Sequence, residues 1–265
     1  MVEIADARGC HISHFKKAIR IVSLVPSQTE LLFDLGLESE VIGITKFCIH
    51  PEVWFRTKTR IGGTKNIDVE KIKALQPDLI LANKEENEKE QIEELAAQFP
   101  VWVTNVSNLN DAFNMIETVG FLTGKKEAAT FLNTHIAKGF EKLNAVKPLT
   151  PIRVCYLIWK EPYLTVGGDT FIHDMLEQVG FKNVFRHETR YPEISLHALQ
   201  KINPHVLLLS SEPYPFSEKH ISIFQSHLPD TKICLADGEM FSWYGSRLQQ
   251  APSYFESLLT QLNRI

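Results

Sequence analysis

Aromatic side chains gather in loops that follow predicted strands, an arrangement suited to binding a flat ligand. In the first half of the chain the candidate ligand contacts are Phe47, His50, Trp54, Thr64 and Lys65. In the second half they are Trp159, Tyr163, Tyr191, Glu212, Phe216, Trp243, Tyr244 and Arg247. Aromatic rings stack efficiently on flat ligands, and ligands meet parallel sheets beyond the carboxyl ends of the strands. We therefore predict that these residues line a ligand site. A loop aromatic can instead seal the end of a hydrophobic core, which is the alternative for each one taken singly.

The polar members of this set leave two further kinds of chemistry open. Neutral imidazole and carboxylate oxygen are metal ligands, so His50 and Glu212 are the candidates for a metal site. No HxH or HExxH spacing joins the histidines, so a three-ligand site would have to be assembled across distant parts of the chain. Arg247 could pair with a ligand carboxylate through two parallel hydrogen bonds. Its alternative role is a cap or a salt bridge at the start of the last helix.

Catalytic and zinc-binding signatures are missing from the chain. Neither GxGxxG, a Walker loop nor GxSxG occurs, and the four cysteines include no CxxC pair, so we expect free thiols. Ser27, Asp169 and His173 could be drawn as a triad, but serine and aspartate beside predicted helices serve more simply as caps. The sequence therefore favours a binding protein over an enzyme.

A repeated segment indicates how these residues are positioned. The segment from Ile72 to Glu85 recurs in pattern as the segment from Leu199 to Glu212. Each copy is a helix end, a proline that stops the helix, and an apolar strand that finishes in polar residues. Such a strand is typical of a parallel sheet buried on both faces. Two copies predict two similarly built lobes, and clefts between lobes are where small ligands bind.

The remaining pattern completes the predicted fold. A strand over 20–25 leads into a helix that Ser27 and Glu30 would start as a capping box and that Gly36 would end. Further helices are expected over 109–122 and 171–179, and a terminal helix over 246–262.

One long helix is predicted between the lobes. Apolar residues at helical spacing, with Phe131 and His135 counted among them, run through 124–147 without an internal proline. The fold class is therefore α/β, with two parallel-sheet lobes joined by a single backbone helix. The predicted boundaries are 20–123 for the N-terminal lobe, 124–147 for the helix and 148–265 for the C-terminal lobe.

Composition excludes several classes of protein. The chain has 265 residues and a formal net charge of −4, which argues against a nucleic-acid binder. No run is long and apolar enough to span a membrane. The first 20 residues carry several charges and no continuous apolar segment, so they do not form a secretory signal as written. The sequence as written indicates a cytoplasmic protein, unless the true start has been removed.

The segment from Arg20 to Gly36, RIVSLVPSQTELLFDLG, resembles the opening of type III periplasmic binding proteins. These are the helical-backbone receptors for vitamin B12, siderophores, heme and metal ions, and the closest subgroup is the cobalamin-binding one. The turn at 61–63, the segment 70–80, the long helix and the second-lobe repeat fit the same family. The resemblance extends from residue 20 to the C-terminus and implies a periplasmic or cell-surface protein with two α/β lobes and a ligand in the cleft.

The resemblance also implies roles for individual residues. His50 stands where the B12 binders place a tyrosine before proline, and Tyr163 and Tyr191 stand where they use aromatics. Thr64 takes the place of a tryptophan. Family members dock onto a membrane permease through one acidic residue on each lobe. The docking candidates are Glu70 in the first lobe and His197, with Glu193 close by, in the second.

We therefore expect a non-enzymatic solute-binding protein with no intrinsic cofactor. Its ligand is expected to be a cobalamin-type corrinoid or another metal chelate, held in an aromatic cleft for ABC-type uptake. The alternative is a cytosolic protein that handles metal, heme or siderophore, or an enzyme acting on a bound tetrapyrrole. The expected partners are the small-molecule ligand and an ABC transporter permease, with no nucleic acid, and the chain is expected to be a monomer.

Overall fold

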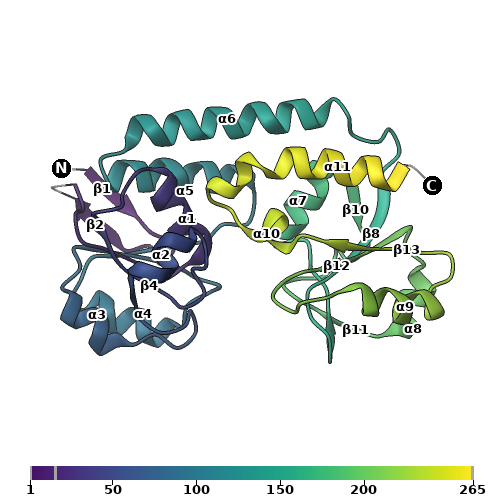
Figure 1. Cartoon of the computed structure of the whole chain (residues 1–265), viewed down its shortest axis with the longest axis horizontal. Coiled ribbons are helices and arrows are strands. Elements are labelled where there is room, and N and C mark those ends of the chain that lie inside the picture. Colours follow the sequence, from purple (N-terminus) through teal and green to yellow (C-terminus); the bar gives the residue numbers. More distant parts are fainter. Residues whose placement is uncertain (1, 15–16, 264–265) are drawn as a thin grey trace. The chain divides into compact units, whose positions relative to one another are not determined.

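The computed structural model describes residues 2–14 and 17–263, and the chain divides into two compact units (Figure 1). The first unit takes in the residues up to 106, then 110–135 and 244–247. The second takes in 107–109, 136–243 and the residues from 248 onward. The chain therefore passes between the units more than once. The last two residues of the predicted C-terminal lobe, 264 and 265, lie outside the described residues.

The first unit is built on a sheet in which all neighbouring strands are parallel. Its strands, in the spatial order β5-β4-β3-β6-β7, are β3 (Ile21–Ser23), β4 (Val41–Ile44), β5 (Thr59–Arg60), β6 (Leu79–Asn83) and β7 (Val101–Thr104). Its helices are α1 (Pro26–Asp34), α2 (Glu52–Thr57), α3 (Val69–Leu75), α4 (Lys89–Ala96) and α5 (Leu109–Leu122). Every residue of β3, β6 and β7 is buried, as expected of a parallel sheet covered on both faces.

The second unit repeats this plan with a shorter sheet. Its parallel strands, in the order β10-β8-β12-β13, are β8 (Ile152–Leu157), β10 (Phe181–Asn183), β12 (Val206–Ser210) and β13 (Lys232–Ala236). The short strands β9 (Tyr163–Leu164) and β11 (Glu193–Ile194) form an antiparallel pair. The helices are α7 (Phe171–Val179), α8 (Leu196–Ile202), α9 (Glu218–His227), α10 (Gly238–Ser242) and α11 (Ala251–Asn263). The prediction of two parallel-sheet α/β lobes is confirmed.

Helix α6 (Lys126–Asn144) contributes residues to both units and is shorter than the predicted 124–147. Gly124 precedes it with φ +68°, a left-handed geometry that a helix interior does not allow and glycine adopts readily. Phe131 and His135 are exposed, so counting them in the buried stripe was wrong. The buried residues of the helix are instead Ala129, Leu132, Asn133, Ile136, Phe140 and Leu143.

An N-terminal hairpin was not expected from the sequence. It consists of β1 (Val2–Ala5) and β2 (His11–His14), which pair antiparallel. The turn between them lies against the outer edge of β7. The Ala7 amide donates to the Val103 carbonyl at 2.8 Å, and the Val103 amide donates to the Asp6 carboxylate at 3.3 Å. The Arg8 guanidinium donates to the Val101 carbonyl at 2.9 Å and pairs with Asp6 at 2.7 Å. This turn therefore satisfies the backbone groups of an edge strand.

Two predicted helix starts are wrong, and proline explains both. Helix α1 begins at Pro26, with Val25 as the N-cap residue and no side-chain cap, so the capping box of Ser27 and Glu30 does not form. Proline suits the first helical position because its missing N–H would have no partner there. The terminal helix begins at Ala251 rather than 246, which places Pro252 in its first turn instead of its interior. A short 3-10 helix, Ser246–Gln249, precedes it.

Glycine follows two helices, and for Gly36 this confirms the helix end predicted from the sequence. Gly36 follows α1 with φ +71° and Gly180 follows α7 with φ +87°. Thr170, not Asp169, caps α7, because its side chain accepts the His173 amide. Within the described residues, none of the helices combines the length and apolar character that crossing a bilayer requires.

Candidate functional site

The strand order of the second unit reverses between β8 and β12, and this reversal locates a candidate ligand surface. In parallel α/β sheets, ligands bind beyond the carboxyl ends of the strands at such a reversal. Trp159 follows β8 and Tyr214 follows β12, and their ring centroids lie 5.8 Å apart. Two aromatic rings are therefore in contact at the carboxyl ends of β8 and β12, where the strand order predicts a ligand site.

We call Trp159, Tyr163 and Tyr214 the strand-end aromatic group. Trp159 is 39% exposed, and the two tyrosines are half-buried. Tyr214 packs on the buried Phe216 at 4.7 Å, and Tyr163 packs on Phe224 at 5.2 Å. The Tyr214 amide donates to the Ile158 carbonyl at 3.2 Å, which attaches its loop to the end of β8. The group therefore combines accessible ring surface with a fixed backbone, which suits stacking on a flat ligand.

Glu212 lies in the same loop, but its carboxylate already has partners. Its Oε1 accepts a hydrogen bond from Ser242 Oγ at 2.6 Å and another from Trp243 Nε1 at 3.0 Å. Burial raises the pKa of Glu212, and these two hydrogen bonds act in the opposite direction. Glu212 therefore has a structural role, because its hydrogen bonds fix Trp243 and the C-terminal end of α10.

In the first unit the strand order reverses between β3 and β6, and Asn87 connects the loops around this point. Its Nδ2 donates to the Leu24 carbonyl at 3.4 Å and to the Thr64 carbonyl at 3.0 Å. Lys65 Nζ donates to the Glu85 carbonyl, beyond the end of β6, at 2.7 Å. Two predicted contacts, Thr64 and Lys65, are thereby brought to the carboxyl ends of the strands.

Phe47 and His50 follow β4 in the same unit. Phe47 is 51% exposed, and the Lys46 ammonium lies 5.1 Å from its ring centroid. His50 is half-buried, and a positive charge on its imidazole would lower the pKa of Glu30 in α1. Phe47 therefore has an accessible ring, and its role as a ligand contact stays a prediction.

Arg247 and Glu30 form a buried, two-bond ion pair within the first unit. Arg247 Nε donates to Glu30 Oε2 at 3.0 Å and Nη2 donates to Oε1 at 2.6 Å. The side chains are 10% and 13% exposed. Burial raises the pKa of Glu30 although the guanidinium opposes the rise. The guanidinium predicted to meet a ligand carboxylate thus meets a carboxylate of the protein, which is the salt-bridge alternative.

Four other predicted contacts are buried. Phe216 and Tyr244 are each 5% exposed and Trp243 is 7% exposed. Trp54 is fully buried and lies in α2, packed edge-on against Phe33 at 5.3 Å, so its predicted place in a loop is wrong. For these residues the structure matches the alternative reading, in which an aromatic seals the core.

The three docking candidates are exposed, and two of them lie in the first turns of helices. Glu70 lies in the first turn of α3, where it pairs with Lys73 at 2.8 Å. His197 lies in the first turn of α8, and Glu193 lies in β11 just before it. Tyr191, a predicted ligand contact, is half-buried and lies 5.5 Å from the Arg190 guanidinium.

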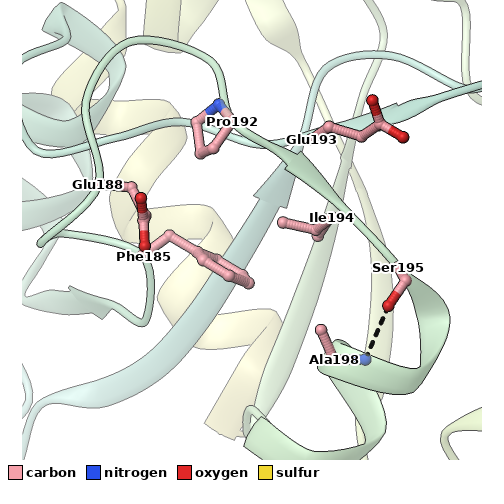
Figure 2. Close-up of a pocket in the computed structure, with 7 residues that line it drawn as sticks. All are labelled: Phe185, Glu188, Pro192, Glu193, Ile194, Ser195 and Ala198. Atoms are coloured by element: carbon pink, nitrogen blue, oxygen red, sulfur yellow. Dashed lines mark hydrogen bonds between the residues drawn. The ribbon is translucent and has the colours of Figure 1, made fainter.

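A pocket of about 480 Å³ opens beside Glu193 in the second unit (Figure 2). Phe185 and Ile194 point toward one another across it, and Ser195 caps α8 by accepting the Ala198 amide at 3.1 Å. The other residues that line it are Glu188, Pro192 and Glu193. None of the predicted ligand contacts lines this pocket, so it does not coincide with the candidate ligand surface at the strand ends.

Metal ligands are scattered in the folded chain. Across residues 2–14 and 17–263 there is no group of three or more histidine, cysteine or acidic side chains that could hold a metal ion. The candidates His50 and Glu212 therefore have no preformed cluster around them in the described part of the chain. The cysteines are free, as expected, with Cys10 exposed and Cys48, Cys155 and Cys234 buried.

Sequence reasoning missed three residues that shape these surfaces, namely Asn87, Glu30 as an ion-pair partner, and His220, whose Nε2 lies 3.3 Å from Tyr214 Oη. Asn87 could have been suspected because it closely follows a fully buried strand, where an amide side chain needs backbone partners. The pairing of Glu30 with Arg247 joins residues 217 positions apart, and no local pattern signals it.

The family model for periplasmic binding proteins matches residues 21–231. The uncharacterized ABC transporter substrate-binding lipoprotein YvrC of Bacillus subtilis is 28% identical over 78% of this chain and 68% of its own length. The vitamin B12-binding protein of Vibrio parahaemolyticus is 28% identical over 72% of this chain and 70% of its own. The solved structure of the periplasmic heme-binding protein HutB of Vibrio cholerae superposes with a TM-score of 0.78 at 20% identity, covering 91% and 98% of the two chains.

These similarities define the class of the protein. Its relatives and structural neighbours are substrate-binding proteins rather than enzymes. The chain belongs to the periplasmic binding protein family. It is a solute-binding protein, as expected from its sequence.

Proposed function

We propose that this protein binds a cobalamin-type corrinoid for ABC-type uptake, using the strand-end aromatic group of its second unit. The observation that carries the proposal is the strand-end aromatic group at the topological reversal of the second unit. In the first unit the exposed Phe47, with Thr64 and Lys65, forms a separate candidate surface. The relationship to a vitamin B12-binding protein supports the same ligand class.

Titration with cobalamin, cobinamide, heme and ferric siderophores, followed by tryptophan fluorescence, tests the proposal. We expect cobalamin or cobinamide to bind most tightly. Trp159→Ala should weaken that binding roughly tenfold or more, because a stacked ring loses both buried area and its aromatic contact. Trp102→Phe is the matched control, since Trp102 lies in β7 outside the proposed site and is 6% exposed. Failure of every ligand to quench the fluorescence would rule the proposal out.

Heme is the second candidate, because the fold matches that of a heme-binding protein. The same titration separates the two, since tight binding of heme with no binding of either corrinoid would favour heme. Elemental analysis combined with the visible absorption spectrum of the purified protein separates both from direct binding of a metal ion, since a bare ion adds metal without the absorption of a corrin or porphyrin ring.

Docking to a permease is part of the proposal. Glu70 and Glu193 are both exposed, so cationic groups on a membrane partner can reach their carboxylates, and at Glu70 such a group would compete with the exposed Lys73. Charge reversal at both positions should reduce association with the cognate permease while leaving ligand affinity unchanged. Unchanged association would show that these residues do not form the docking surface.

A further inference from the structure

The pocket beside Glu193 takes no part in the candidate ligand surface of either unit. It lies within the second unit and has a volume of about 480 Å³. Its floor is formed by Phe185 and Ile194, which are 8% and 9% exposed and belong to the hydrophobic core of that unit. The half-buried Pro192 and Ala198 add to this apolar surface. The floor is therefore apolar and is held in place by the packing of the core.

Two glutamates form the rim of this pocket. Figure 2 shows Glu188 and Glu193 on opposite sides of it, with Phe185 and Ile194 between them. Both glutamates are exposed, and in the described part of the chain neither carboxylate forms a hydrogen bond or an ion pair. The lining residues that the structure describes include no lysine, arginine or histidine. The pocket thus combines an apolar floor with two negative charges at its edge.

Both glutamates project from backbone that is fixed by hydrogen bonds. The Glu188 amide donates to the Phe185 carbonyl at 2.9 Å, and the Glu188 carbonyl accepts from the Gly168 amide at 2.9 Å. A Cβ at Gly168 would lie 2.2 Å from the nearest backbone oxygen, so glycine is required for this close approach. Glu193 lies in β11, where it pairs with Leu164 of β9. The two carboxylates are therefore positioned before any partner arrives, which lowers the cost of binding one.

The charges at this pocket favour a cation. Helix α8 begins beside it, and the positive end of the helix opposes a cation with about half an elementary charge. Ser195 also accepts the Ala198 amide there, which satisfies one of the free N–H groups of that end. Two full negative charges outweigh the remaining effect of the helix. An apolar floor beneath them suits a cation that carries an apolar stem.

Arginine meets this description better than lysine does. Its three methylenes can lie on the apolar floor, and its planar guanidinium presents five donors in a rigid fork. A fork of that kind can donate to two carboxylates on opposite sides at once, whereas a lysine ammonium is a compact point charge that keeps its hydration more strongly.

We propose that this pocket receives one arginine side chain of the membrane permease, with the guanidinium between Glu188 and Glu193 and the methylenes on Phe185 and Ile194. The inference rests on the permease docking of the proposed function and specifies it. Of the three docking candidates only Glu193 lines the pocket. Glu188 becomes a second docking residue, and the apolar floor makes the contact selective for arginine.

The chemistry of the pocket can be tested without the permease. The probes are acetyl-arginine amide, the corresponding lysine derivative, and the citrulline derivative, which has the shape of arginine but a neutral urea group. Methyl NMR spectra of the full chain report binding at Ile194 and Ala198. We expect saturable shifts with the arginine probe in the millimolar range, weaker binding of lysine, and no saturable shift with citrulline. Glu188→Gln and Glu193→Gln should each weaken arginine binding roughly 3- to 10-fold, as for a partly exposed charge pair.

Matched controls separate the pocket from net charge. Glu218→Gln removes one exposed carboxylate of the same unit from the first turn of α9, outside the pocket, and should leave arginine binding unchanged.

A second measurement tests whether the permease supplies the arginine. Ala198→Met fills the pocket with an apolar side chain that helices accept, and it keeps both carboxylates. Association with the cognate permease in nanodiscs should fall roughly tenfold, as for losing one well-placed side chain of an interface. Gln200→Met, at an exposed position of the same helix outside the pocket, is the control and should associate like the wild type. Corrinoid affinity should be unchanged in all of these variants.

The outcomes distinguish this inference from the proposed function. If the arginine probe does not bind, or if citrulline binds equally well, the inference is wrong, while corrinoid binding and docking through exposed charges stand. If the arginine probe binds but Ala198→Met associates with the permease like the wild type, the pocket holds a small cation instead and the assignment of the partner is wrong. If the wild type does not associate with the permease at all, the inference and the docking proposal both fail, and corrinoid binding is unaffected.

Discussion

Replacing Arg247 with methionine should destabilise the first unit strongly and in a pH-dependent way. The substitution keeps an unbranched apolar stem in place of the arginine methylenes and removes the partner of Glu30, which is 13% exposed and held by two hydrogen bonds. Removing one member of a buried ion pair typically costs about 3–5 kcal/mol, because the other charge stays buried without compensation. We expect a loss in that range at pH 8.

The pH dependence follows from Glu30. Burial already raises the pKa of Glu30 in the folded protein, and Arg247 opposes that rise. Without the guanidinium the folded-state pKa rises further, so the folded variant binds a proton more tightly than the unfolded chain does. Its stability then falls as the pH rises from the ordinary carboxyl pKa through the raised one. The deficit of Arg247→Met should therefore be full at pH 8 and shrink as the pH approaches 5.

Urea unfolding at both pH values, followed by circular dichroism, measures the deficit. Hydrogen exchange of the α1 amides assigns it to the first unit. The double variant Glu30→Gln, Arg247→Met removes both charges and should recover most of the loss, since neutral replacement of a buried pair is often tolerated. A loss below about 1 kcal/mol at pH 8, or one equal at both pH values, would refute the reasoning.

Two further predictions concern the strand-end loop and the segment around residue 245. Glu212→Gln keeps an Oε1 that can accept from Ser242 and Trp243 but does not titrate. Because burial raises the pKa of Glu212, wild-type stability falls as the pH rises through that value, so the variant should be the more stable at pH 8 and lose this advantage toward pH 4. Glu212→Ala should instead lose about 1–3 kcal/mol by removing the oxygen that accepts the hydrogen bonds of Ser242 and the Trp243 indole N–H, and equal urea midpoints for the two variants would contradict this account. Gly245→Ala would place a Cβ 2.4 Å from the Ser27 carbonyl oxygen, so we expect a thermal-melting loss equivalent to about 1–3 kcal/mol, and an unchanged melting temperature would show that the backbone yields there.

The fold was largely predictable because its signals are local. The strand after Pro77 and its counterpart after Pro204 are continuous apolar runs, and the structure buries every residue of β6 and β12. Helices α5 and α7 have the predicted ends, and Gly180 marks one of them. The terminal helix failed where a local signal, Pro252, was overlooked.

The accessibility of the predicted site residues could not be read from the sequence. Trp54 and Trp159 both looked like loop aromatics, yet one is fully buried and the other is 39% exposed. Their difference arises from packing partners such as Phe33 and Tyr214, and the second of these is distant in the chain. Arg247 is similar, because its role depends on a carboxylate 217 positions away. Local sequence patterns predict which helix, strand or loop a residue belongs to, whereas contacts with residues distant in the chain determine whether its side chain is exposed to solvent.

The turn of the N-terminal hairpin has a consequence for how the protein behaves at high concentration. An uncovered edge strand offers unpaired amides and carbonyls to any other chain that can add a strand, and such edges promote aggregation. Within the part of this protein that the structure describes, no full strand pairs with the outer edge of β7. The side chains of Asp6 and Arg8 instead form hydrogen bonds with the backbone amide of Val103 and the backbone carbonyl of Val101. Removing residues 2–14 should therefore leave the ligand surfaces intact but increase self-association and proteolytic sensitivity near Val101–Thr104. For expression and crystallisation, the hairpin belongs with the folded domain and is not a tail to be trimmed.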